Sequence, residues 1–228
     1  MKVALLLGPP GSGKGTVAEL LRRAQGGYVH FATGDMLREE VKNGSDVGHE
    51  AEPYMKRGEL VPDALIIHIV EQRLEMGDAE AAYLFDGFPR TLIQADLLDE
   101  SLAQRGRTID VVIYLATLRE VILQRLTGRR VCKECGASFH IINIPPAVEG
   151  ICDTCGGELY QRKDDNEETI ANRLDVYNRQ TESLIARYEE KGLLFSVDSD
   201  QGLESLMAQI EKRLGAGSAG SPQAGADA

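Results

Sequence analysis

The sequence predicts an α/β fold, with a five-stranded parallel sheet flanked by helices. Three observations predict it. An apolar run at residues 3–7 leads directly into a glycine-rich loop. Further apolar runs of strand length alternate with stretches of helical spacing, the pattern that builds parallel sheets. Two segments, 32–61 and 128–165, break that alternation and are expected to be small lobes inserted into one main domain.

The expected core elements follow one another along the chain. Strands are expected at the apolar runs 2–7, 28–31, 82–85, 111–115 and 194–197. Helices are expected where apolar residues recur at helical spacing, at 16–23, 118–127, 167–190 and 203–214. Ligands bind such sheets at the carboxyl ends of the strands, which is where the glycine-rich loop lies.

The segments outside this alternation have their own composition. Residues 32–61 are charged and glycine-containing, which favours short helices, whereas residues 128–165 hold the cysteines in a β-like, turn-rich sequence. After Leu214 the chain is mostly glycine, alanine and serine. Because such a tail has almost nothing to bury, residues 215–228 are expected to be disordered.

The glycine-rich loop reads GPPGSGKGT over residues 8–16. Glycines let successive backbone N–H groups turn inward, Lys14 adds a positive charge, and the following helix presents its positive end to the same anion. A flexible turn is the alternative, but the strand before the loop and its spacing favour a site for a nucleoside triphosphate. The candidate ATP-binding residues are Gly11, Ser12, Gly13, Lys14, Gly15 and Thr16.

The loop departs in one place from the commoner pattern, since Gly15 follows Lys14 and the hydroxyl of Thr16 comes one position later. A direct bond from Thr16 to magnesium is therefore in doubt, and the phosphates and water are expected to hold that ion. Asp86, at the end of an apolar run, is the candidate residue to hold the water molecules around that ion. A helix N-cap is the alternative role for Asp86.

Composition limits the function classes. The net charge of −11 argues against broad nucleic-acid binding, which needs a basic face. No apolar run approaches the ~20 residues that cross a bilayer, and the start of the chain lacks the pattern of a signal peptide. A cytoplasmic protein with no membrane and no nucleic-acid partner is expected.

The four cysteines form two C-x-x-C pairs, Cys132 with Cys135 and Cys152 with Cys155. This spacing indicates a closed structural zinc site with four thiolate ligands. Disulfide pairing is the alternative, disfavoured in a reducing compartment. A nucleic-acid-binding zinc ribbon would need a basic surface, and the flanking residues are largely acidic. Zinc is expected to stiffen a lobe too small to fold alone.

Four motifs occur in order, at residues 8–16, 33–38, 86–91 and 162–169. With them, the chain resembles the bacterial adenylate kinases of the long form, whose lid binds zinc through four cysteines. The resemblance covers residues 1 to about 214. It implies a P-loop nucleotide kinase, likewise built on the five-stranded sheet, that is a monomer and interconverts ATP, AMP and ADP with magnesium by direct in-line transfer.

The resemblance also implies a division of the chain. The core P-loop domain is expected to be discontinuous, at 1–31, 62–127 and 166–214. The nucleoside monophosphate (NMP)-binding insertion is expected at 32–61, the zinc-binding lid at 128–165, and the tail at 215–228.

Arginine suits phosphoryl transfer, because its guanidinium holds phosphate oxygens with paired, fixed N–H donors. The candidate catalytic residues at motif positions are Lys14, Arg38, Arg90, Arg125, Arg129, Arg162 and Arg173. The resemblance implies that Arg38 and Arg90 grip the AMP phosphate. It also implies that Arg129, Arg162 and Arg173 close over the transferring group. A scattered surface arginine is the alternative, weighed most heavily for Arg125.

The resemblance extends to the two nucleotides. The AMP site is expected to comprise Thr33, Arg38, Glu59, Leu60, Val61, Gly87, Phe88, Pro89, Arg90, Gln94, Arg162 and Arg173. Gln94 can pair with a base edge, with a solvated helix position as its alternative. Beyond the loop, the ATP site is expected to use Arg129, Ser138, Phe139 and Gln201.

Asp164 and Asp165 lie beside Arg162, and general acid–base work is one interpretation of such a pair. A lid hinge that orients nearby arginines is preferred, because the acceptor is already an ionised phosphate. The four histidines, at 30, 49, 68 and 140, are interpreted as structural or surface residues.

Two rival functions remain. One is a kinase of another nucleoside monophosphate on the same fold. The other is a zinc-ribbon protein that binds ATP as a regulatory ligand. The arginine motifs disfavour the second rival, since ATP sensing needs no second phosphate site.

Overall fold

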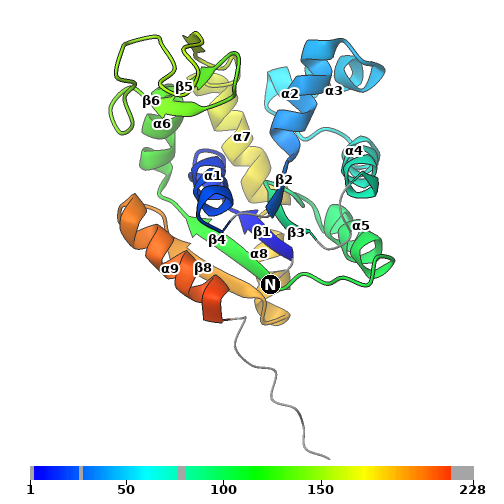
Figure 1. Ribbon diagram of the computed structural model, residues 1–228. Coiled ribbons are helices and arrows are strands. Elements are labelled where there is room, and N and C mark those ends of the chain that lie inside the picture. The colour runs from blue at the N-terminus through cyan, green and yellow to red at the C-terminus, as the bar shows by residue number, and fades with distance from the viewer. Residues whose placement is uncertain (1–2, 26–27, 77–80, 217–228) are drawn as a thin grey trace, which may run out of the picture.

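The structure is a computed structural model that describes residues 3–25, 28–76 and 81–216. A five-stranded sheet runs through its centre with helices on both faces (Figure 1). Its strands are β1 (Val3–Leu7), β2 (Tyr28–Ala32), β3 (Ala82–Asp86), β4 (Val111–Ala116) and β8 (Leu194–Asp198). All neighbouring strands are parallel, in the order β2-β3-β1-β4-β8. The predicted parallel sheet is confirmed, with each described strand end within one residue of expectation.

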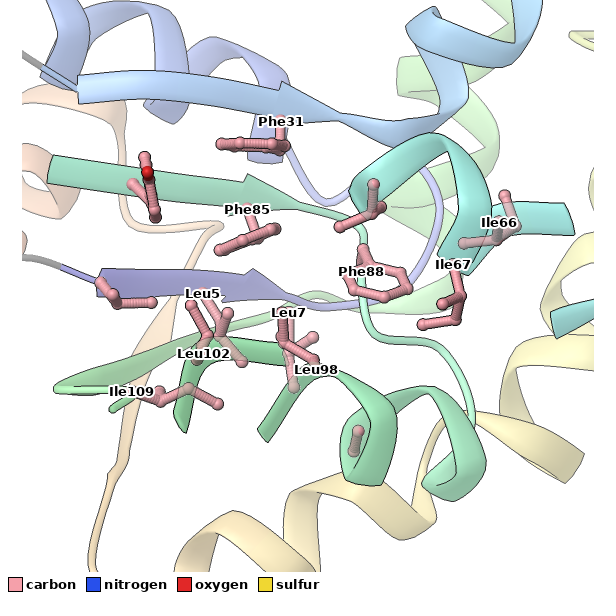
Figure 2. Close-up of a cluster of buried hydrophobic side chains, with 14 of the residues drawn as sticks. Leu5, Leu7, Phe31, Ile66, Ile67, Phe85, Phe88, Leu98, Leu102 and Ile109 are labelled. Atoms are coloured by element: carbon pink, nitrogen blue, oxygen red, sulfur yellow. The ribbon is translucent and has the colours of Figure 1, made fainter. Parts of the chain in front are cut away.

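Both faces of this sheet are buried, which is why its strands are almost continuously apolar. Alternate side chains of one strand enter opposite cores: Leu5 and Leu7 lie in one, Leu6 in the other. Helices α4 (Asp63–Glu75), α5 (Leu92–Ala103) and α8 (Ser183–Glu190) cover the first core, and α1 (Lys14–Gln25) and α9 (Leu203–Ala216) cover the second. Figure 2 shows the first core, where Phe88 lies beside Ile66 and Ile67.

One predicted helix is two. The stretch expected as a single helix at 167–190 forms α7 (Glu167–Gln180) and α8, interrupted at Thr181. The N–H groups of Thr181 and Glu182 both donate to the carbonyl oxygen of Tyr177, so the regular hydrogen-bond ladder ends there. The expectation of one long helix was therefore wrong, because apolar spacing continues across the break.

Two helices were not predicted. In α4, apolar side chains surround the helix, with Ile66, Ile67, Ile69 and Val70 all buried, so no single apolar stripe marks it. Helix α5 begins after Thr91, whose hydroxyl accepts a hydrogen bond from the N–H of Gln94 at 3.1 Å. The spacing of Thr91 and Gln94 is a helix-start signal that sequence reasoning passed over.

The segment after β2 forms short helices, as predicted: α2 (Thr33–Asn43) and α3 (Asp46–Arg57). The two helices pack closely because Gly48 has no side chain, and a Cβ there would overlap the backbone of Glu40. Figure 1 shows this pair above the end of β2, on the same side of the molecule as β5 and β6.

The cysteine-containing segment forms a second, smaller sheet. Its antiparallel strands are β5 (Arg129–Cys132), β6 (Ser138–His140) and β7 (Leu159–Tyr160), in the order β6-β5-β7. It follows directly on α6 (Arg119–Thr127), so the predicted β-like, turn-rich character is confirmed. We call residues 129–160 the β5–β7 unit.

Helix α9 continues through Gly215 to Ala216, two residues beyond its expected end. The rest of the tail, residues 217–228, lies outside the described residues, so the expectation of disorder there stays a prediction. Across the described ranges, no helix is both long and apolar enough to cross a membrane.

Candidate active site

The glycine-rich loop connects β1 to α1 at the carboxyl edge of the large sheet, and α1 begins at Lys14 itself. The ammonium group of Lys14 folds over the loop and donates to the carbonyl oxygens of Gly8 and Pro9, both at 2.8 Å. Burial lowers the pKa of Lys14 to about 7, with Asp86 opposing the shift and nearby arginines adding to it. A bound anion would restore the charge, so the loop is suited to phosphate.

Five arginines from five parts of the chain form a cluster beside this loop, in which Arg38 and Arg162 reach it only through the other three. Burial is the first cause that lowers the pKa of Arg162 and of Arg173, each to about 10, and neighbouring arginines lower both further. The pKa of Arg90 is also lowered, by burial and by Arg38. Arg129 is the fifth member, since its charge depresses the pKa of Lys14. Like charges packed this closely favour an incoming polyanion.

Three carboxylates are interleaved with these arginines. Asp164 accepts a hydrogen bond from Nη1 of Arg173 at 2.9 Å. Asp165, only 1% exposed, accepts from Nε of Arg129 at 2.8 Å. Both acids of the predicted hinge pair therefore hold arginine side chains in place, which agrees with the orienting role rather than with a free general base.

The third carboxylate, Asp35, was not singled out from the sequence. It lies in α2 and accepts hydrogen bonds from Nε of Arg38 at 3.1 Å and from Nη2 of Arg162 at 2.9 Å. Asp35 and Arg38 are three residues apart on one face of a helix, so their contact could have been predicted from the sequence. The contact with Arg162 joins residues 127 positions apart and could not be predicted without the fold.

A cleft beside the arginine cluster contains most of the predicted AMP site. Ten of the twelve expected residues line it: Thr33, Arg38, Glu59, Leu60, Val61, Gly87, Phe88, Arg90, Gln94 and Arg173. Pro89 and Arg162 are not among the lining residues. The apolar side chains of Leu37, Met55 and Ile66 also line the cleft. Nothing in their local sequence distinguishes these three from ordinary core residues.

Gln94 is 2% exposed, so the solvated helix position considered for it was wrong. Its side-chain oxygen accepts from the N–H of Arg90 at 2.7 Å, and its side-chain nitrogen donates to Oδ1 of Asp63 at 2.7 Å. The amide is thus held at both ends at the wall of the cleft.

The turn after β3 delivers Arg90 to the cluster. Gly87 has φ +66°, a conformation that favours glycine, and its N–H donates to the carbonyl oxygen of Leu6 at 3.2 Å. The carbonyl oxygen of Gly87 in turn accepts from Nε of Arg90 at 2.7 Å. Phe88, which follows in the turn, is buried in the core shown in Figure 2, so its side chain fixes the turn to that core.

Asp86 ends β3, and its carboxylate faces the start of α1 near Gly15. Thr91, not Asp86, caps the next helix, so the N-cap alternative was wrong. His30 of β2 lies beside Asp86, with Nε2 at 3.6 Å from Oδ2. The interpretation of His30 as a structural or surface residue gave no indication of this neighbour.

Arg125 is not brought into the arginine cluster. Its guanidinium donates to Oγ of Ser199 at 2.9 Å and to the carbonyl oxygen of Ser199 at 2.8 Å, and it lies 3.2 Å from Oδ1 of Asp200. These bonds tie α6 to the end of β8. The donors of Arg125 are used by Ser199 and Asp200 in this structure, so its expected catalytic role stays a prediction.

The other residues expected around ATP lie apart in this structure. Ser138 is exposed, whereas Phe139 is buried with Cys132, Cys152 and Leu159 in the β5–β7 unit. The side chain of Gln201 is exposed and accepts hydrogen bonds from Ser205 and Gln209.

The four cysteines meet in the β5–β7 unit, with all four sulfurs within 4.8 Å of one another. The Sγ atoms of Cys132 and Cys155 are 3.4 Å apart and those of Cys135 and Cys152 are 3.6 Å apart. Tetrahedral zinc with bonds of about 2.3 Å separates its sulfurs by about 3.8 Å, so the donor set fits zinc. No disulfide is formed among them.

Thiolate formation is favoured at two of these cysteines. The N–H groups of Cys135 and Glu134 donate to the sulfur of Cys132 and lower its pKa. Burial raises the pKa of Cys152, but the N–H groups of Cys155 and Thr154 outweigh this and bring it to about 6. Thiolate is the form that binds metal.

Comparisons with known proteins place these features in context. Residues 6–193 match the family model described as adenylate kinase. The chain is similar to the adenylate kinase of Carboxydothermus hydrogenoformans, with 50% identity over 92% of this chain and 98% of that protein. It is 49% identical to the adenylate kinase of Geobacillus sp. (strain WCH70), over 92% and 97%. The adenylate kinase of Archaeoglobus fulgidus is 47% identical over 92% and 96%.

Proposed function

This chain belongs to the adenylate kinase family and is a nucleoside monophosphate kinase that acts on ATP, AMP and ADP, and we propose how its residues divide the work. Lys14 and the loop residues 11–16 hold the triphosphate. Arg38 and Arg90 hold the phosphate of AMP, and Arg129, Arg162 and Arg173 neutralise the group that moves between them. The observation that carries this proposal is the convergence of Lys14 and five arginines beside one cleft.

In the proposed transfer, an ionised phosphate oxygen of AMP attacks the γ-phosphorus of ATP. The new P–O bond forms as the bond to the β–γ bridging oxygen breaks, and that oxygen keeps the electron pair as part of ADP. No proton leaves the nucleophile, so no base is needed. The protein contributes positions and positive charge, which are the main demands of phosphoryl transfer.

The acids take an orienting role in this proposal. Asp164 holds Arg173 and Asp165 holds Arg129, so each arginine is fixed before substrate arrives. Preorganised donors stabilise developing charge without reorganising during the reaction. Asp164 and Asp165 also lie between the β5–β7 unit and α7, which suits the hinge of a closing lid.

Two metals are proposed. Asp86, beside the start of α1, would help to hold the water shell of Mg²⁺, which when bound with ATP neutralises phosphate charge. Cys132, Cys135, Cys152 and Cys155 would hold a structural Zn²⁺ that stiffens the β5–β7 unit.

For the adenines, the proposal assigns Thr33, Gln94 and the backbone of residues 59–61 to AMP. Ser138, Phe139 and the backbone near Gln201 are assigned to ATP, with closure of the β5–β7 unit bringing Ser138 and Phe139 to the base. A zinc site of four reduced cysteines suits the cytoplasm, where thiols stay reduced, and the monomer remains a proposal by resemblance.

The test is coupled detection of ADP after magnesium-ATP is mixed with AMP, and separately with CMP, UMP and GMP. Fast turnover confined to AMP is expected. No turnover with any monophosphate, by protein that still binds ATP, would overturn the proposed division of roles.

A further inference from the structure

Asp63 contacts the cleft only through other residues. It is the first residue of α4, and its Oδ1 accepts two hydrogen bonds from the start of α5. One comes from Oγ1 of Thr91 at 3.2 Å and the other from Nε2 of Gln94 at 2.7 Å. Thr91 donates here because an ionised carboxylate only accepts, and the same hydroxyl oxygen accepts from the N–H of Gln94. Asp63 was not among the residues singled out from the sequence.

These bonds leave the amide of Gln94 one orientation. An ionised carboxylate only accepts hydrogen bonds, so the nitrogen of Gln94 must face Asp63. A backbone N–H only donates, so the oxygen of Gln94 must face Arg90, as its 2.7 Å bond shows. Rotating the amide by half a turn would place donor against donor at Arg90 and acceptor against acceptor at Asp63. In a side chain this buried, either mismatch is strongly unfavourable.

The orientation matters because a side-chain amide can pair with either kind of purine. Adenine offers an acceptor at N1 and a donor at its 6-amino group, while a 6-oxopurine offers a donor at N1 and an acceptor at O6. An amide that can rotate satisfies both bases, whereas a fixed amide satisfies one. After its bonds to Asp63 and Arg90, Gln94 retains one N–H and one oxygen lone pair for a base.

We propose that Asp63 is a specificity-determining positioning residue, which locks the amide of Gln94 in the orientation that accepts adenine and rejects 6-oxopurine monophosphates. This inference rests on the proposed role of Gln94 at the AMP base. Asp63 acts only through Gln94 and does not touch the nucleotide.

The test compares AMP with inosine monophosphate (IMP), whose base is a 6-oxopurine, in wild-type protein and in Asp63→Asn. Asparagine keeps the size of aspartate but can donate as well as accept, so it tolerates a rotated Gln94. The ratio of kcat/KM for AMP to that for IMP is expected to fall on the order of tenfold. The change should lie in KM for the monophosphate, with KM for ATP unchanged.

The matched control is Asp96→Asn, which removes a carboxylate from the same helix α5. Asp96 pairs with Arg187 at 2.7 Å and is not among the residues that line the cleft. Its AMP-to-IMP ratio should equal that of the wild type. If Asp63 only joined α4 to α5, Asp63→Asn would alter thermal stability. It would then lower kcat/KM for AMP and for IMP by the same factor and leave their ratio unchanged.

A folded Asp63→Asn protein with the wild-type ratio would overturn this inference and leave the proposed function standing. Wild-type protein that phosphorylates no monophosphate would overturn both. If Asp63→Asn does not fold, ¹⁵N NMR of the wild-type protein decides. Slow exchange of the Nε2 protons of Gln94 with solvent would support a fixed orientation of the amide. Rapid exchange of both protons would refute it.

Discussion

The large sheet and the β5–β7 unit are both β-structure, but they are held together differently. The large sheet buries apolar side chains on both faces, in two cores that also contain side chains of the flanking helices. The β5–β7 unit buries one cluster of Cys132, Phe139, Cys152 and Leu159. Two members of that cluster are candidate metal ligands. The first region is stabilised by burial of apolar area and the second has little of it.

This difference indicates which region needs a metal ion to fold. Full burial of a large apolar side chain contributes about 1.5–3 kcal/mol, and fixing the backbone of one residue costs about 1–2 kcal/mol. Phe139 and Leu159 cannot offset the ordering of the whole unit. A closed metal site can, because metal binding supplies folding free energy directly. A unit that folds around metal rather than on the main core can also move as a body.

The largest expected effect is on the β5–β7 unit alone. Chelating zinc from the whole protein, or replacing Cys152 by Ser, should unfold residues 129–160 while the large sheet stays folded. Structural zinc contributes about 10–16 kcal/mol in small zinc-binding peptides, far more than this unit's apolar cluster. Hydrogen exchange should show lost protection in β5–β7 and retained protection in β1 and β4.

Thr154→Ser is the matched control, because Thr154 lies between Cys152 and Cys155 and offers only its backbone N–H to Cys152. It should keep zinc and protection. Equal loss of protection in both regions after chelation would contradict the distinction between them.

The second prediction places catalysis between the two regions. Arg90→Ala should lower kcat/KM for AMP by about a thousandfold or more, equivalent to about 4 kcal/mol of transition-state stabilisation. The free energy of unfolding should not fall, because Arg90 is a cation whose pKa is already lowered by burial. Steady-state kinetics and urea unfolding measure the two quantities.

Arg105→Ala controls for loss of an arginine, since Arg105 follows the end of α5 and its side chain donates to Ser101 in the last turn of that helix. Its activity should stay near the wild type. Turnover by Arg90→Ala close to that of this control would remove Arg90 from the proposed phosphate site.

The third prediction compares one phenylalanine from each region. Phe85 is fully buried in the large sheet and its ring is stacked on Phe31, with centroids 4.6 Å apart. Phe85→Ala should lower the free energy of unfolding of the large sheet by about 3–5 kcal/mol. Phe139→Ala should loosen the β5–β7 unit and leave that free energy nearly unchanged. Urea unfolding followed by circular dichroism tests this, and equal global losses would show that the regions unfold as one.

The smallest expected effect is a proton taken up at Lys14. Its pKa is about 7 in the free protein and is ordinarily 10.5, so the unfolded state binds more protons between these values. This group therefore makes stability rise with pH across that window. A bound triphosphate raises the pKa again, so binding at pH 8 should take up about one proton.

Calorimetry of ATP binding in buffers of different ionisation enthalpy measures this proton. Lys14→Arg should take up none, because arginine stays charged throughout. Uptake should be nearly the same before and after zinc removal, because burial, Asp86, Arg90 and Arg173 of the main body affect the pKa of Lys14 more than Arg129 of the β5–β7 unit does. An uptake that disappears with zinc would tie the loop to the β5–β7 unit instead.

Features carried by local spacing could be predicted from the sequence. The phosphate loop and the two cysteine pairs are short motifs whose chemistry lies within a few residues of chain. The five strands were readable because both faces of the sheet are buried, which makes each strand a continuous apolar run. Helix α4 escaped prediction for the same reason, since an apolar helix buried on several sides has no stripe.

Short motifs in the chain identify the groups that this protein uses: a glycine loop with a lysine, arginines at motif positions and four thiols. Which of these groups meet depends on the tertiary structure. Only the fold turns Arg125 to Ser199, joins Asp35 to Arg162 and sets Asp63 against Gln94. The physical reason is that a hydrogen bond depends on a separation of about 3 Å in space, and spacing along the chain fixes that distance only within one helix or one turn.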